Sequence, residues 1–206
     1  MIKVTDSIFS ILNGILGKAT NNLSKPKAAH TCEHLLCFVD QSSFDLVISR
    51  DLLFIHDATL SQEPYISGTV NSCLEICDMI QHSGKLAPQE GFRLGLIAFR
   101  DHPFRRYQDK FVTDDFGGFT FDVEKVKQNL QSLTAEGGDD LPEAVTAALA
   151  KALTLDWRPL AAKMIVLIAD APPHGIGEEY DNFPDGSPDG ELVLTGAGKW
   201  SKHYTL

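Results

Sequence analysis

Three apolar runs in the chain each end on an aspartate. The runs LLFIHD, LGLIAFRD and MIVLIAD end at Asp57, Asp101 and Asp170. Runs of this length, rich in Ile, Leu and Val, are typical of strands that are buried on both faces of a parallel sheet. We therefore predict strands over residues 51–56, 93–99 and 163–169.

Between these strands the apolar residues recur at helical spacing. Helices are predicted over residues 64–83, 122–133 and 144–153, with short edge strands over 110–113 and 119–121. Asp140 and Glu143 fit a capping box at the start of the third helix. The alternation of strand and helix predicts a three-layer α/β fold, a mostly parallel sheet flanked by helices.

The two ends of the chain differ from this regular part. Residues 1–50 are predicted to form an N-terminal extension, with an amphipathic helix marked by Ile8, Ile11, Leu12, Ile15 and Leu16. The α/β domain is expected over 51–190, and a short tail over 191–206. The residues after Asp170 are few and rich in Pro, Gly and acidic residues. We therefore expect an α/β domain that is truncated at its C-terminus.

Charge and cysteine content narrow the function classes. A net charge of −10 over 206 residues argues against binding to nucleic acid or to anionic membrane surfaces. Cys73 and Cys77 lie four residues apart in a predicted helix, where they are expected to be small core residues in a reducing compartment. With no apparent signal sequence and no apolar run long enough to cross a membrane, we expect a cytoplasmic location. His30, Cys32, His34 and Cys37 lie close together and could form a zinc site, but their spacing matches no common zinc pattern.

The loops that follow the strands carry the candidate chemistry. Ligands bind at the carboxyl ends of the strands in open α/β sheets. The loop Asp57-Ala-Thr59-Leu-Ser61 offers a carboxylate and two hydroxyls on alternate residues, and Asp170 follows another strand. These are hard oxygen ligands that suit Mg²⁺, Mn²⁺ or Ca²⁺.

A third loop, the Gly-rich segment 136–143, precedes the last predicted helix. In this loop, in the loop at 57–61 and in the loop that begins at Asp170, the chain resembles a von Willebrand factor type A (VWA) domain, over roughly residues 51–190. Asp57, Thr59 and Ser61 match the family's first metal loop, DxSxS. Asp139 stands where the second loop normally has a threonine, and Asp170 stands in the third. The stretches FRDHP, EGGDDLPEAV and LIADAPPHG are similar to A domains that are attached to alpha-type protein kinases, and to A domains of related fungal proteins.

The resemblance implies a metal-ion-dependent adhesion site and a non-catalytic protein-interaction module. In that family an acidic side chain of the partner completes the coordination of the ion. With Asp57, Asp139 and Asp170 at one ion, we expect tight or calcium-tolerant binding and less need for an acidic partner. Two alternatives stay open: Asp140 or a water takes part while Asp139 points away, or the acidic residues are helix caps that hold no metal.

An enzyme is the rival hypothesis. A magnesium-dependent phosphohydrolase of the haloacid dehalogenase type would use Asp57 as nucleophile and place Asp170 on Mg²⁺. That chemistry needs a second acid two residues after the nucleophile, where this chain has Thr59. His102 and His174 follow strands at the same edge, either beside the site or without a role in it. Asp101 either touches the metal or holds its loop by backbone hydrogen bonds.

Overall fold

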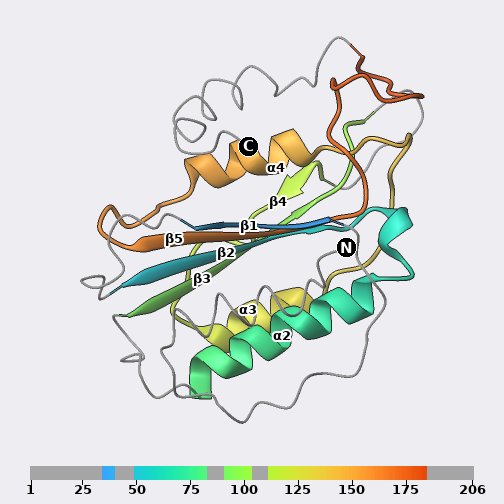
Figure 1. Ribbon diagram of the computed structural model, residues 1–206. Helices are drawn as coiled ribbons and strands as arrows, with labels where there is room; N and C mark the ends of the chain where they lie inside the picture. Colours follow the sequence, from blue (N-terminus) through green and yellow to red (C-terminus); the bar gives the residue numbers. More distant parts are fainter. Residues whose placement is uncertain (1–33, 40–48, 83–90, 104–110, 185–206) are drawn as a thin grey trace.

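The described part of the computed structural model is built on one five-stranded mixed sheet (Figure 1). Residues 34–39, 49–82, 91–103 and 111–184 are described, the first of these for the backbone alone. The strand order is β1-β5-β2-β3-β4, with β2 parallel to both β3 and β5 and with antiparallel pairing at the two edges. The strands are β1 (His34–Val39), β2 (Arg50–Asp57), β3 (Phe92–Phe99), β4 (Thr113–Asp114) and β5 (Ala162–Ala169).

Helices cover both faces of this sheet. Figure 1 shows α2 (Ile66–His82) and α3 (Val123–Gln131) side by side on one face and α4 (Val145–Thr154) on the other. The predicted three-layer α/β fold is therefore confirmed. Across the described residues, no helix combines the length and apolar character needed to cross a bilayer.

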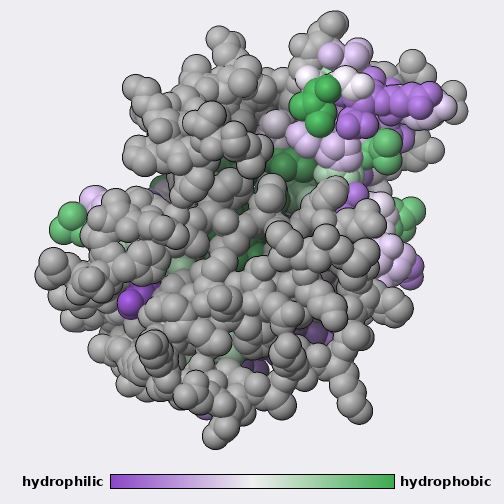
Figure 2. Space-filling view, in the orientation of Figure 1, coloured by the Kyte–Doolittle hydropathy of each residue, from purple (hydrophilic) through white to green (hydrophobic). Residues whose placement is uncertain are grey.

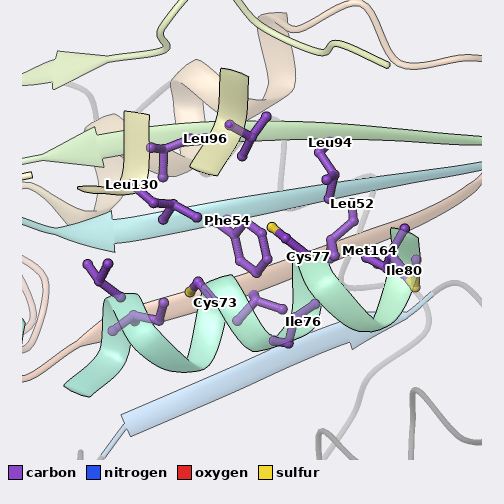
Figure 3. Close-up of a cluster of buried hydrophobic side chains, with 14 of the residues drawn as sticks. Leu52, Phe54, Cys73, Ile76, Cys77, Ile80, Leu94, Leu96, Leu130 and Met164 are labelled. Atoms are coloured by element: carbon purple, nitrogen blue, oxygen red, sulfur yellow. The ribbon is translucent and has the colours of Figure 1, made fainter. Parts of the chain in front are cut away.

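Alternating side chains of the central strands fill two separate cores. Leu52, Phe54 and Leu94 pack toward α2 and α3, together with Cys73 and Cys77 of α2 (Figure 3). This is the expected use of both faces by strands that are apolar throughout. The two thiols are free and buried, as predicted, and burial raises the pKa of Cys77 to about 12. A thiol so far from ionising is a core residue and not a nucleophile.

The second core lies under α4. Leu53, Ile55, Ile97 and Phe99 pack against the buried alanines of that helix. Because alanine has a short side chain, α4 can pack close to the sheet, and this brings the loop before it to the edge where the strands end.

The predicted element boundaries hold within a few residues for the strands and for α3. Helices α2 and α4 also begin close to their predicted starts, at Ile66 and Val145, and the 3-10 turn η1 (Leu60–Gln62) lies between β2 and α2. Asp122 caps α3 by accepting a hydrogen bond from the Lys125 amide at 3.1 Å. The expected edge pieces appear as β4 and as paired backbone hydrogen bonds between Leu94 and Thr120.

The capping box predicted at α4 is wrong. The helix begins at Val145, and its N-cap residue, Ala144, makes no side-chain capping hydrogen bond. Asp140 and Glu143 instead make hydrogen bonds to the loop after β5. The Asn182 amide donates to Asp140 Oδ2, and the Glu143 amide donates to the Pro172 carbonyl.

Several expectations fall outside the described residues. These are the amphipathic N-terminal helix, the tail over 191–206, and the side chains of the alternative zinc site. Strand β1 belongs to the segment 1–50, yet it pairs with β5 in the same sheet from His34 to Val39. The sheet thus includes a strand that precedes the regular alternation.

A buried ion cluster closes the amino end of the central strands. Asp51 is fully buried and accepts two hydrogen bonds from the Arg93 guanidinium, at 3.0 and 2.9 Å. It also accepts from the Arg158 Nε at 2.8 Å and from the Arg158 backbone at 2.9 Å. Burial by itself raises the pKa of Asp51, but the hydrogen bonds from both arginines outweigh it, and the pKa lies below its ordinary value.

Asp51→Asn is predicted to lower the free energy of unfolding by about 3 kcal/mol at pH 7, because it leaves two arginines without their buried anion. The folded-state pKa is depressed, so this contribution is present above the unfolded-state pKa of about 3.9 and is lost as the pH falls through the folded value. Urea unfolding at several pH values measures it.

Asp156→Asn is the matched control. This carboxylate is 98% exposed and lies 3.6 Å from Arg93 Nη1, so its loss should cost about 0.5 kcal/mol or less. Equal effects of the two substitutions would contradict the assignment of Asp51 as the centre of this cluster.

Candidate metal centre

Three loops meet at the carboxyl end of the parallel strands. The loop after β2 is tied to the Gly-rich loop before α4 by the Leu60 amide, which donates to the Gly137 carbonyl at 3.0 Å. The Gly-rich loop is tied to the loop after β5 by the Glu143 amide, which donates to the Pro172 carbonyl at 2.9 Å. The convergence predicted from parallel strands is therefore observed.

Four of the five predicted ligands form one hydrogen-bonded series, the Asp57–Asp170 network. Asp57 Oδ1 accepts from the Thr59 amide at 2.9 Å and from the Thr59 hydroxyl at 2.8 Å. The Thr59 and Ser61 hydroxyl oxygens are 3.0 Å apart, and Ser61 donates to Asp170 Oδ1 at 3.0 Å. Ser61 and Asp170, which are 109 positions apart in sequence, are thereby joined by a hydrogen bond between their side chains.

The fifth predicted ligand, Asp139, contacts a neighbouring loop through its backbone amide. Its amide donates to Asp101 Oδ2 at 3.1 Å, and its side chain is half-buried. This hydrogen bond orients the Gly-rich loop. No described contact of the Asp139 side chain links it to the Asp57–Asp170 network.

Glu143 from the same loop lies against Thr59 instead. Glu143 is 3% exposed. Gly138 has a φ of +84°, a left-handed conformation that favours glycine, and a Cβ there would lie 3.0 Å from Glu143 Oε1 and 3.3 Å from Thr59 Cβ, so both side chains come close to this position. Sequence reasoning missed Glu143 because it fitted a local cap, although the glycines of the same loop signal a close approach.

The carboxylates at this end of the sheet lie close together, so ionising them builds up negative charge. Burial raises the pKa of Asp57 to about 7; hydrogen bonds from Thr59 oppose this rise, and the nearby carboxylate of Asp170 adds to it. Burial, followed by repulsion from Asp57 and Asp101, raises the pKa of Glu143 to about 10. A cation would lower both values, since it favours the ionised carboxylates.

Nearby basic side chains do little to neutralise this charge. His56 Nδ1 lies 2.6 Å from the Asp57 carbonyl and Nε2 lies 2.8 Å from Thr69 Oγ1. Burial lowers the pKa of His56 to about 4, so this ring is neutral. Arg100 is directed to the Ala58 carbonyl at 3.2 Å and to Glu136 at 3.4 Å.

Two carboxylate oxygens beside the Asp57–Asp170 network are left without partners. Within the described part of the chain, Asp57 Oδ2 and Glu143 Oε2 are shielded from solvent and make no hydrogen bond. An unsatisfied buried acceptor costs roughly 1–3 kcal/mol, more when it is charged. Oxygen donors, excess negative charge and unpartnered oxygens together fit a hard divalent cation.

A second group, the His174 cluster, consists of Asp101, Asp140 and His174. Each offers one ligand atom, and these atoms lie within 4.8 Å of one another. His174 Nε2 is 2.7 Å from Asp101 Oδ1, and Nδ1 is 2.9 Å from Asp181 Oδ1. Burial by itself lowers the pKa of His174, but the hydrogen bonds to Asp101 and Asp181 outweigh it and raise the pKa.

Asp101 holds its own loop by a backbone hydrogen bond, which is one of the two roles predicted for it. Its Oδ1 accepts from the His102 amide at 2.6 Å, in addition to the contacts with Asp139 and His174. His102 and His174 are both buried, with ring centroids 5.7 Å apart. Both rings lie at the carboxyl end of the strands, and a role for them in the predicted metal site stays a prediction.

Comparison with known proteins gives one informative relative. No family model matches the chain. The chain is similar to alpha-protein kinase vwkA of Dictyostelium discoideum, with 32% identity over 144 residues. The matched region is 68% of this chain and 21% of that protein, so the chain spans about a fifth of the relative's length. The similarity agrees with the predicted resemblance to domains of alpha-type protein kinases and supports a VWA-like relation.

Proposed function

We propose that this chain is a non-catalytic protein-interaction module of the VWA type that depends on a divalent cation, Mg²⁺ or, alternatively, Ca²⁺ or Mn²⁺. The observation that carries the proposal is the Asp57–Asp170 network, with Asp57 Oδ2 and Glu143 Oε2 buried beside it without partners. The similarity to a region of an alpha-protein kinase supports the same function.

The ligand set that we propose differs from the sequence prediction at one position. Asp57, Thr59, Ser61 and Asp170 would hold the ion directly or through water, as the resemblance implies. Glu143 would supply the carboxylate of the second loop in place of Asp139. The ion would add positive charge among these oxygens and leave a position open toward a partner.

The partner would approach across the three loops. Ser61 is exposed, and so are apolar side chains on the same loops: Leu60, Leu141, Ile176 and Tyr180. At the upper right of Figure 2, hydrophobic residues border a hydrophilic surface over the described loops. We propose a protein partner there, joined to the ion by an acidic side chain. Three carboxylates already facing the ion would make that last bond weak and the site tolerant of Ca²⁺.

The rival phosphohydrolase has less support. Asp57 is fully buried, and its Oδ1 is engaged twice by Thr59, the position where that chemistry needs a second acid. An enzyme would show turnover of an aryl phosphate that Asp57→Asn abolishes, and the proposed module would show none. The cytoplasmic location expected from the sequence stays a prediction.

Calorimetric titration of the chelator-treated chain with Mg²⁺, Mn²⁺ and Ca²⁺ tests the proposed ion. Wild type should bind one ion at the Asp57–Asp170 network and unfold at a higher temperature when it is bound, because the ligand stabilises the folded state by mass action. Asp57→Ala should weaken binding at least tenfold. Ser67→Ala, at an exposed position in α2, is the control that should bind as wild type does. Absence of both binding heat and thermal shift in wild type would remove the cation from the proposal.

Glu143→Gln and Asp139→Asn separate the two carboxylates of the Gly-rich loop. Both changes keep the size of the side chain and remove one charge. We expect Glu143→Gln to weaken Mg²⁺ binding about tenfold or more and Asp139→Asn to change it by less than about threefold, since only Glu143 lies against Thr59. The reverse order would restore Asp139 as the ligand.

A further inference from the structure

We propose that the His174 cluster is a second metal centre, one that takes a zinc-like ion such as Zn²⁺ or Co²⁺. This centre does not rest on the proposed function, because none of its ligands belongs to the Asp57–Asp170 network. Its three residues come from different places in the chain: Asp101 follows β3, Asp140 precedes α4, and His174 follows β5.

The positions of the ligand atoms suit a single ion. The imidazole nitrogen and the two carboxylate oxygens lie within 4.8 Å of one another, so small side-chain rotations would let one ion contact all three at about 2.0–2.2 Å. Asp101 and His174 are each 2% exposed. Burial of these two ligands strengthens their bonds to the ion, and Asp140 is half-buried.

His174 is oriented as metal-binding histidines usually are. Its Nδ1 faces the Asp181 carboxylate at 2.9 Å, which fixes the ring and leaves Nε2 directed into the cluster. Asp181 is itself held by the Gly175 and Phe183 amides, each at 2.7 Å. The short contact between Nε2 and Asp101 now holds a proton, and a bound cation would take the place of that proton.

Asp140 provides an independent observation. Its Oδ2 accepts a hydrogen bond from the Asn182 amide at 2.6 Å. Its Oδ1, by contrast, is shielded from solvent and has no hydrogen-bond partner among the described residues. A cation held beside the histidine and the second carboxylate would satisfy this acceptor.

The donor types define the class of ion. One imidazole nitrogen with two carboxylates suits Zn²⁺ and Co²⁺, whereas Mg²⁺ and Ca²⁺ prefer ligands that are all oxygen. The two centres should therefore take different ions from one mixture. Both centres use the Gly-rich loop before α4 and the loop after β5, so each should stabilise the end of the sheet that the other uses.

Cobalt absorption in the presence of saturating Mg²⁺ tests this assignment on the full chain. Co²⁺ bound by nitrogen and oxygen in a site of low coordination absorbs in the visible far more strongly than the aqueous ion does. Wild type should bind one Co²⁺ with such bands, and Zn²⁺ should displace it. His174→Gln and Asp140→Asn should each weaken Co²⁺ binding at least tenfold.

Ser61→Ala is the matched control for the other centre. It should leave the Co²⁺ bands unchanged while it weakens Mg²⁺ binding, so the two proposals fail separately. If His174→Gln does not fold, the nearly isosteric Asp140→Asn decides. The assignment is overturned if wild type shows no protein-bound cobalt spectrum, if Asp140→Asn keeps full affinity, or if a near-ultraviolet sulfur-to-cobalt band places the ion on cysteine.

Discussion

Repulsion among crowded carboxylates is the constraint on which the carboxyl end of this sheet depends. Sheet pairing and backbone hydrogen bonds between the loops bring Asp57, Glu143 and Asp170 together. Two of their carboxylate oxygens are buried without hydrogen-bond partners. Such an arrangement is costly by itself. Hydrogen bonds from Thr59 and Ser61 offset part of the cost, and protonation or a cation must offset the rest.

The two ends of the parallel strands meet this problem in opposite ways. At the amino end, Asp51 is neutralised by Arg93 and Arg158, so the cluster is complete within the chain. At the carboxyl end, His56 is neutral, Arg100 is directed to the Ala58 carbonyl and Glu136, and His174 lies between Asp101 and Asp181. None of these contacts is with a carboxylate of the Asp57–Asp170 network. A closed ion cluster fits a structural role, and an edge with unbalanced charge fits a binding role.

Local sequence signals predicted much of the architecture. The apolar runs ending at Asp57, Asp101 and Asp170 were sufficient for the three central strands, because burial on both faces demands continuous apolar residues. The spacing of Asp57, Thr59 and Ser61 anticipated that these oxygens lie together, since alternate residues of one tight loop have few other places to go.

Long-range contacts explain what the sequence did not predict. Glu143 fits a helix cap when only its neighbours are considered, yet the fold offers it Thr59 from another loop across Gly138. His174 bridges Asp101 and Asp181 in a way that no spacing rule indicates. Pairing of β1 with β5 likewise depends on a partner more than a hundred residues away in sequence.

The most direct test of the central claim is an anomalous difference map from a crystal grown with Mn²⁺ after chelator treatment. The account predicts a peak at about 2.0–2.6 Å from oxygen atoms of the Asp57–Asp170 network, with Glu143 turned toward it directly or through water. An ordered edge with no peak there, and with the carboxylates paired to one another by protons, would contradict it.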